Sequence, residues 1–332
     1  MWEETDFISN IIKLNIGAPL YTAPSESNSL IYNPLSFLLT YAIAWPVGLT
    51  KSVVGLRSIQ LVYVCFAALL ATVCCGKLRR MAFPQREIQN GGLWAILAFL
   101  AMFLAATSPY VNRFVHTLHV DALSLLISVI SFWAMLRYAE KATIGNLVFM
   151  AACPAVGFLT KQFLISWIGV MLVFLLLLDP KNLKRLGMFF LLSSGFTLIA
   201  FLLCYAVWGD NYIFWTVEVM GGERKAIVFS PDSYSISISR GIDHVARAWP
   251  EIFVGVIGAW FLLRWGEVRK VGPLVAAWVV LLATEGFSSG AGWSVLYHFG
   301  PAILIGAILI FAVLPQVWER ASGEIRSVPR VV

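Results

Sequence analysis

Residues 186–207 read LGMFFLLSSGFTLIAFLLCYAV and contain no charged side chain. A run of about 20 apolar residues is long enough to cross the hydrocarbon core of a bilayer as an α-helix. The whole chain shares this character, because 59% of its 332 residues are hydrophobic and 13% are charged. Ordinary soluble domains carry about 25% charged residues. The composition therefore excludes a soluble enzyme and a disordered chain, and it predicts a polytopic membrane protein.

Nine apolar stretches are predicted to cross the membrane, so the expected fold class is all-α, a polytopic transmembrane helical bundle. They lie at residues 56–76, 92–110, 121–138, 145–160, 163–179, 186–207, 251–265, 272–287 and 299–315. The chain is interpreted as a single membrane-embedded domain over residues 1–330. Its parts are a first outer loop (1–55), a six-span core (56–207), an outer loop (208–250), three C-terminal spans (251–315) and a cytoplasmic tail (316–332).

The basic residues indicate which way the spans run. Lys and Arg concentrate in the cytoplasmic loops of membrane proteins. Short basic segments occur here at 77–91, 137–144, 180–185 and 264–271 and in the C-terminal tail, and all five share one side if the spans alternate. The outer side then receives residues 1–55, 111–120, 160–162, 208–250 and 288–298. The 208–250 loop also contains basic residues, but the agreement of five short segments favours this orientation.

The N-terminal segment is polar, and no apolar helix comes before it. In the alternating topology residues 1–30 lie outside, and neither a signal peptide nor a first span carries them across. We therefore expect that a first span precedes Met1 and is missing from the sequence.

The cysteines are predicted to be structural. Cys65, Cys74, Cys75, Cys153 and Cys204 fall within or at the ends of the predicted spans. Their spacing matches no metal-ligand pattern, and an odd number of cysteines in lipid is no disulfide framework. They are interpreted as small apolar packing residues.

Three acids, Glu3, Glu4 and Asp6, stand before residues 7–16, whose apolar positions have helical spacing and which Gly17 ends. Acids near a helix N-terminus are stabilised by the helix dipole, so the cluster could mark only a helix start. A carboxylate held at the membrane surface could instead act as a general base.

A second polar cluster precedes the predicted span at 121–138 and contains Arg113, His116, His119 and Asp121. Asp121 could be a simple helix N-cap. An N-cap, however, does not require the neighbouring arginine and histidines. The two histidines are three residues apart and could suggest a metal, but no companion ligand motif accompanies them.

Lys161 lies in a very tight outer turn, residues 160–162, between two apolar helices. Its side chain could reach along the helix to the membrane surface. A lysine ammonium is also a good point charge for a phosphate. Together, carboxylates, cations and histidines at one face of an apolar bundle suit a ligand with an anionic head and a lipid tail.

The order of these features resembles the GT-C fold membrane glycosyltransferases, in the branch of dolichyl-phosphate-mannose–protein mannosyltransferases and aminoarabinose transferases (glycosyltransferase family 39-like). The matching residues are Glu3-Glu4, Gly17-Ala18-Pro19-Leu20-Tyr21, Tyr32-Asn33-Pro34-Leu35 before an interfacial stretch at 35–47, Arg57, Asp121-Ala122-Leu123, Leu159-Thr160-Lys161-Gln162 and Phe214-Trp215-Thr216-Val217-Glu218. The chain departs from the family pattern in three places. Glu-Glu replaces Asp-Glu, Asn33 replaces a lysine, and Gln162 replaces a glycine.

The resemblance implies transfer of a sugar from a polyprenyl-phosphate donor to a lipid, glycan or protein acceptor at the outer face, with inversion and without a metal or other cofactor. The compact loops favour a location in the plasma (inner) membrane of a bacterium, with the active site on its outer face. The implied base is Glu3, Glu4 or Asp6, with an orienting or second acidic role for Asp121. The implied substrate contacts are Lys161, Arg113, His119, Arg57, Tyr32 and Asn33, and more weakly Tyr297 and His298.

Two other functions remain open from the sequence. Transporters and lipid flippases tend to place polar sites near the midplane, often in repeated halves. The sequence shows no repeat, and Glu285 is the acid closest to the middle of a predicted span. An inactive, truncated relative is the third hypothesis, because the first span is expected to be missing.

Overall fold

The computed structural model describes residues 2–26, 28–85, 91–108, 117–219, 239, 242–289 and 299–322. Within these ranges the regular structure is entirely helical. The helices are α1 (Trp2–Ile16), α2 (Leu35–Ala44), α3 (Val53–Ala82), α4 (Gly91–Ala106), α5 (Asp121–Glu140), α6 (Ile144–Thr160), the 3-10 helix η2 (Gln162–Ser166), α7 (Trp167–Leu178), α8 (Leu183–Ile213), the π-helix η3 (Phe214–Val219), α11 (Trp249–Trp265), α12 (Val268–Ser289) and α13 (Gly300–Ala321).

Each of the nine predicted spans coincides with one helix among the described residues, from α3 to α8 and from α11 to α13. Five segments of the described part are long and apolar enough to cross a membrane: Val53–Ala82, Asp121–Glu140, Leu183–Val219, Val268–Ser288 and Gly300–Ala321. Helices α4, α6 and α7 are apolar but shorter. The protein is thus a multi-pass membrane protein, and the count of nine spans stays a prediction.

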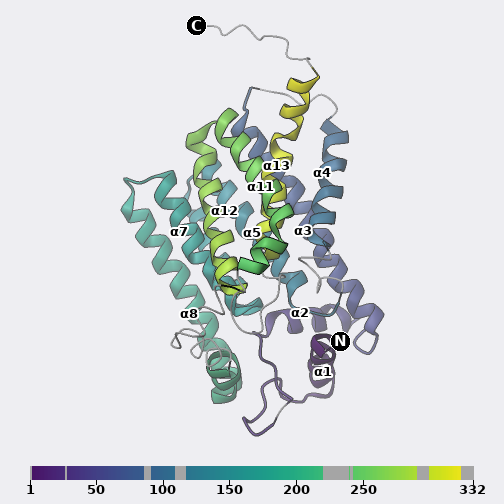
Figure 1. Ribbon diagram of the computed structural model, residues 1–332. Coiled ribbons are helices and arrows are strands. Elements are labelled where there is room, and N and C mark those ends of the chain that lie inside the picture. Colours follow the sequence, from purple (N-terminus) through teal and green to yellow (C-terminus); the bar gives the residue numbers. More distant parts are fainter. Residues whose placement is uncertain are drawn as a thin grey trace.

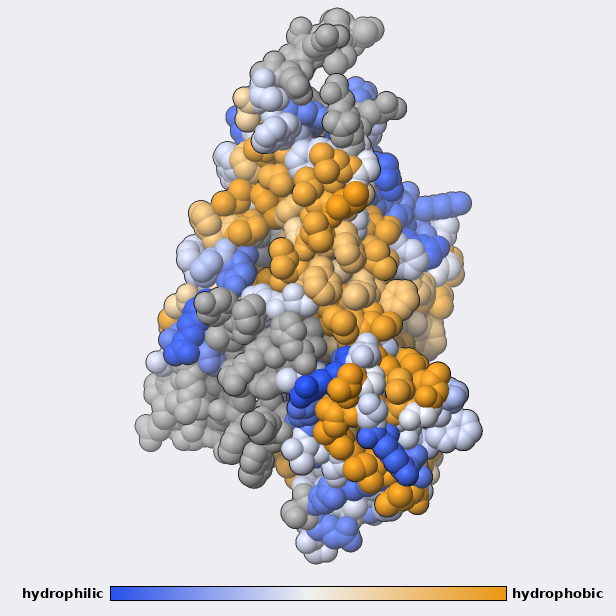
Figure 2. Space-filling model, turned by 90° about the vertical axis from the view of Figure 1, so that its right-hand side faces the viewer, coloured by the Kyte–Doolittle hydropathy of each residue, from blue (hydrophilic) through white to orange (hydrophobic). Residues whose placement is uncertain are grey.

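The long helices run side by side, and α1 and α2 lie at the end of the bundle far from the C-terminus (Figure 1). Helix α2 packs on α1, α3 and α6. Apolar residues dominate the middle of one face of the molecule, and its lower end carries hydrophilic and apolar residues side by side (Figure 2). An apolar exterior of this kind is what helices need where they meet lipid.

Small residues let α11 and α13 approach closely. A Cβ atom added at Gly255 would lie 2.9 Å from the Gly306 Cα atom, and one added at Gly258 would lie 2.4 Å from the Ile310 nitrogen. Close backbone approach at small residues is a common way of packing helices in membranes, where no hydrophobic force drives them together.

Several element ends differ from the sequence prediction. Helix α8 breaks at Gly209, two residues beyond the predicted end of its span, and a second helical piece runs from there to Ile213 and is followed by η3 up to Val219. Gly209 has a φ of 60°, which glycine adopts at little cost. The boundary of the outer loop at residue 208 stays a prediction. Helix α13 likewise runs on to Ala321, into the stretch predicted as the C-terminal tail.

The N-terminal prediction of a helix ended by glycine is confirmed. Helix α1 ends at Ile16, and Gly17 has a φ of 71°. The Ala18 N–H donates to the Lys13 carbonyl over 2.9 Å, which satisfies one of the last carbonyl groups of the helix. The cysteines are also placed as expected, because four of the five are buried and all five are free thiols.

Candidate functional site

Asp121 is the first residue of α5, and its carboxylate is buried, with 6% of the residue exposed. One oxygen, Oδ1, lies 2.6 Å from the Lys161 Nζ atom, and the other, Oδ2, lies 2.8 Å from His119 Nδ1. The N-cap residue of α5 is Val120, and no side chain caps the helix. The Asp121 carboxylate therefore pairs with Lys161 and His119, and the interpretation of Asp121 as a simple helix N-cap is wrong.

Lys161 reaches Asp121 because the chain leaves α6 in an extended conformation. Helix α6 ends at Thr160, Lys161 has φ −154° and ψ 125°, and η2 starts at the next residue. The lysine side chain is 9% exposed, so it lies inside the protein and does not extend to the membrane surface. Gln162 fixes the turn, because its Nε2 donates to the Ile31 carbonyl over 2.8 Å.

Tyr32 borders this group from the segment between α1 and α2. Its hydroxyl lies 3.4 Å from His119 Nε2, and the two rings meet edge to face with centroids 5.5 Å apart. Tyr21 holds this part of the loop, because its hydroxyl donates to the Tyr32 carbonyl over 2.7 Å. We call Asp121, His119, Lys161 and Tyr32 the Asp121 cluster.

Glu4 connects three elements beside this cluster. Its two carboxylate oxygens accept hydrogen bonds of 2.7 Å from Nε and Nη2 of Arg57 at the start of α3. The Leu118 N–H also donates to Glu4 Oε1 over 3.4 Å. The hydrogen bond from the Arg57 guanidinium is the largest influence on this carboxyl and holds the pKa of Glu4 below its usual value.

Asp6 is half-buried on α1. Asn10 Nδ2 donates to the Asp6 carbonyl over 2.9 Å and approaches its Oδ1 at 3.5 Å. Burial raises the pKa of Asp6, and the charges of Lys13 and His119 partly oppose that effect. Helix α1 is linked to this region by the bond between the Leu118 N–H, next to His119 in the sequence, and Glu4.

Asn33 is fully buried, and its carboxamide is engaged by the protein. The Tyr212 hydroxyl of α8 donates to Asn33 Oδ1 over 2.8 Å, and Asn33 Nδ2 donates to the Phe158 carbonyl of α6. In the Phe-Trp motif, Trp215 Nε1 donates to the Thr22 carbonyl over 2.8 Å. These bonds fasten the segment between α1 and α2 to the bundle and so position Tyr32.

The structure brings together most of the site residues predicted from the sequence. Those that meet at one end of the bundle are Glu4, Asp6, Tyr32, Arg57, His119, Asp121 and Lys161. The side chain of Glu3 and residues Arg113, His116, Tyr297 and His298 lie outside the described part of the chain. Among the described residues no group of three or more His, Cys, Asp or Glu side chains could hold a metal ion.

Three contributors were missed in the sequence. The Leu118 N–H carries no side-chain signal, and Asn10 and Tyr212 look like ordinary helix residues. Glu285 is fully buried in α12, and its Oε2 accepts from the Ala302 N–H near the start of α13 over 3.0 Å. It therefore lies by a helix end and not on an interrupted helix at the midplane.

Residues 92–208, which contain His119, Asp121 and Lys161, match the family model described as dolichyl-phosphate-mannose-protein mannosyltransferase. The whole fold is similar to the crystal structure of ArnT from Cupriavidus metallidurans bound to undecaprenyl phosphate, with a TM-score of 0.66 and 17% sequence identity. The apo structure of that ArnT gives a TM-score of 0.61 at the same identity. The chain has the GT-C fold of ArnT.

The resemblance predicted from the short motifs is thereby confirmed. Each ArnT comparison covers 97% of this chain but 57% or 56% of the ArnT chain, so the chain spans little more than half the length of the structures that it matches. No curated protein sequence matches the chain.

Proposed function

We propose that this protein is a membrane glycosyltransferase that moves a sugar from a polyprenyl-phosphate-linked donor to an acceptor at the extracytoplasmic face of a plasma membrane. The observation that carries the proposal is the meeting of the α1 acids, Arg57 and the Asp121 cluster at one end of an apolar bundle. The family match over residues 92–208 and the ArnT fold support it. That ArnT was crystallised with undecaprenyl phosphate, a lipid of the proposed donor class.

The cations of the site suit the donor phosphate. Lys161 is held by Asp121, and Arg57 is held by Glu4, with its guanidinium 48% exposed. A cation that is already oriented loses little freedom when it binds an anion, and charge-assisted hydrogen bonds are the strong ones. Asp121 and His119 are thus proposed as positioning residues for Lys161, and the polyprenyl tail would extend along the apolar helices.

The α1 acids suit the proton transfer. Of the two whose side chains are described, Glu4 is stabilised as an anion by Arg57, whereas burial makes the Asp6 carboxylate more basic. A general base works best when its pKa approaches the operating pH. Asp6 is therefore the favoured base of this pair, and Glu4 is favoured as the residue that orients Arg57.

The proposed reaction is a single displacement. The acceptor hydroxyl gives its proton to the base, and its oxygen forms a bond to the anomeric carbon as the bond from that carbon to the phosphate oxygen breaks. The lipid phosphate monoester leaves with the bonding electron pair, and the configuration at the anomeric carbon inverts. Arg57 and Lys161 would stabilise the charge that develops on the leaving phosphate.

The test is transfer in proteoliposomes. The chain would be supplied with undecaprenyl-phosphate sugars carrying a radiolabel on the sugar, together with a bacterial membrane-lipid and periplasmic extract as acceptor. We expect label to move to the acceptor with wild-type protein and not with Asp6→Asn. Parallel measurement of undecaprenyl phosphate binding separates loss of chemistry from loss of the donor. Failure of the wild-type chain both to bind undecaprenyl phosphate and to transfer any labelled sugar would reject the proposal.

A further inference from the structure

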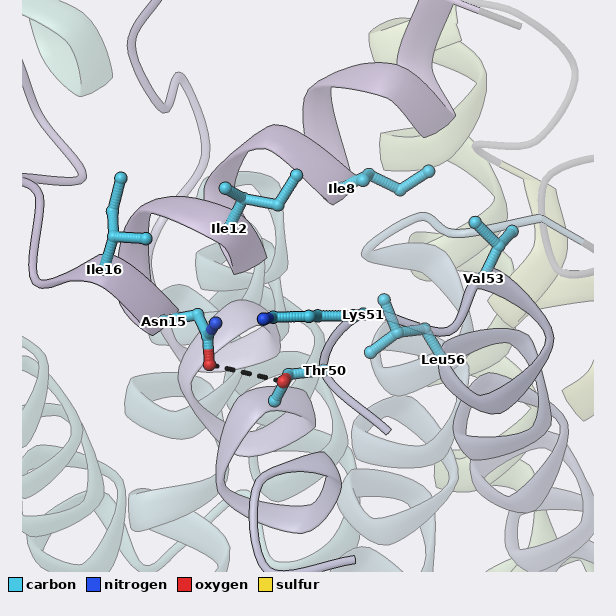
Figure 3. Close-up of a pocket in the computed structure, with 8 residues that line it drawn as sticks. All are labelled: Ile8, Ile12, Asn15, Ile16, Thr50, Lys51, Val53 and Leu56. Carbon is cyan, nitrogen blue, oxygen red and sulfur yellow. Dashed lines mark hydrogen bonds between the residues drawn. The ribbon is translucent and has the colours of Figure 1, made fainter. Parts of the chain in front are cut away.

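A groove lies between α1 and the start of α3, on the outside of the bundle (Figure 3). Its volume is about 290 Å³. Ile8, Ile12 and Ile16 line it from α1, and Val53 and Leu56 line it from α3. Asn15 and Thr50 close it with a hydrogen bond of 3.3 Å. The groove is thus lined mainly by apolar side chains, with a hydrogen-bonded polar pair among its lining residues.

Helix α1 has two apolar faces, and the described part of the chain leaves much of one of them exposed. Phe7 and Ile11 are buried, and Phe7 stacks on Phe37 of α2 with ring centroids 4.5 Å apart. The isoleucines of the groove repeat every four residues and so form a separate row. Ile12 is 46% exposed and Ile16 is 70% exposed. Exposure of such a second apolar row to water is unfavourable, and its contact with hydrocarbon is favourable.

The position of the groove indicates what hydrocarbon covers it. Val53 is the first residue of a helix long and apolar enough to span the membrane, and this helix end places the groove toward one membrane surface. Lys51 stands just before that helix and is exposed, with its side chain extending across the groove (Figure 3). Glu4 lies one turn from Ile8, but Arg57 binds it. The charge left at the groove is therefore the lysine ammonium, which suits an anionic headgroup.

The groove and the proposed base lie on different faces of α1. Asp6 and Ile12 are six residues apart, which places them about 120° apart around the helix axis at 3.6 residues per turn. A donor whose sugar lies near Asp6 would therefore not be expected to fill the groove. This geometry favours a lipid of the surrounding membrane over the polyprenyl donor.

We propose that the α1–α3 groove binds an anionic phospholipid of the membrane, with an acyl chain along the isoleucine row and the phosphate at Lys51. The bound lipid would complete the exposed side of α1 and stabilise the helix that carries Glu4 and Asp6. This site goes beyond the proposed transferase activity, and lipid binding can be measured without any sugar donor.

The experiment uses the full chain in phosphatidylcholine vesicles that contain phosphatidylglycerol with a photoreactive diazirine in its acyl chain. We expect cross-links to concentrate on peptides from α1 and the start of α3. Lys51→Glu should lower labelling of these peptides about fivefold or more, since a lysine near an anionic surface contributes roughly a fivefold preference. Ile12→Asn should also lower it, because the amide breaks the apolar row.

Matched controls come from other exposed positions. Lys181→Glu reverses an exposed charge between α7 and α8, and Leu104→Asn alters a lipid-facing residue of α4 that is 68% exposed. Neither should change labelling in the groove. Even labelling of all lipid-facing helices, or labelling that Lys51→Glu leaves unchanged, would overturn the site. Equal labelling by a phosphatidylcholine probe would overturn the anionic headgroup, and displacement by undecaprenyl phosphate would overturn the assignment to a membrane phospholipid.

Discussion

The Asp121 and Glu4 carboxylates each bind a basic side chain, yet their surroundings are opposite. Asp121 and Lys161 are both 9% exposed in their side chains, and His119 occupies the second carboxylate oxygen. Arg57 is 48% exposed and Glu4 is 16% exposed. We call Asp121–Lys161 the inner pair and Glu4–Arg57 the outer pair. Burial removes the water that would otherwise solvate the charges, so each charge of the inner pair depends on its partner far more than a charge of the outer pair does. The inner pair is built to stay fixed, and the outer pair can open.

The largest effect is expected from breaking the inner pair. Asp121→Ala leaves the Lys161 charge buried without its partner, which should lower the free energy of unfolding by about 3–5 kcal/mol. Thermal unfolding of the purified protein in detergent measures this. The double variant Asp121→Ala/Lys161→Met should recover much of the loss, because it leaves no uncompensated charge. Equal losses in the single and double variants would contradict the coupling.

The next effect concerns the two described acids of α1. Asp6→Asn should slow sugar transfer by about 10²–10⁴-fold if Asp6 is the general base. Glu4→Gln keeps a hydrogen-bonding partner for Arg57 and should slow transfer much less. Initial rates in proteoliposomes at saturating donor distinguish the two. A larger loss with Glu4→Gln would assign the base to Glu4 and reverse the comparison.

The pH dependence of the transfer rate also distinguishes Asp6 from Glu4 as the base. A protonated carboxylate cannot accept the acceptor's proton, so the transfer rate should fall about tenfold per pH unit below the pKa of the base. Because burial raises the pKa of Asp6, its acid limb should lie above the ordinary aspartate value of 3.8. The limb should persist in Glu4→Gln. If Glu4 were the base, the acid limb should instead disappear from the residual activity of Glu4→Gln.

The smallest effect is expected at the outer pair. Arg57→Gln should change the thermal midpoint no more than other surface substitutions do, because solvent and salt screen an exposed ion pair. Lys270→Gln is a matched control, because it breaks the exposed ion pair between Lys270 and Glu267. A loss of stability as large as that of Asp121→Ala would show that the outer pair is structurally essential. Transfer should nevertheless fall if Arg57 contacts the donor phosphate.

Local pattern allowed much of the fold to be predicted. Long apolar runs predicted helices α3 to α8 and α11 to α13, and the row of apolar residues before Gly17 predicted α1. The apolar pattern ends at residue 207, close to the break of α8 at Gly209. The pattern did not indicate the helical residues beyond this break, where Tyr212 and Trp215 hydrogen-bond to the segment between α1 and α2.

The candidate site was only partly predictable. Asp121, Lys161 and the α1 acids stood out as ionisable groups beside apolar helices, where they are costly unless they have a use. Asn33 was predicted to contact substrate, but the structure has its carboxamide bound to Tyr212 and Phe158, and contact with substrate stays a prediction. Sequence reasoning does not reveal such bonds, because their partners are far apart along the chain.

The sequence by itself determined that this protein is a helical membrane bundle with its scarce acids near helix ends. Hydrophobic length and the cost of charge in lipid are local properties, and composition alone expresses them. Only the tertiary structure decided that Glu4 meets Arg57 while Asp121 meets Lys161 and His119. Those pairings depend on how the helices pack, and packing also sets the burial that raises the pKa of Asp6 and the Arg57 contact that lowers the pKa of Glu4.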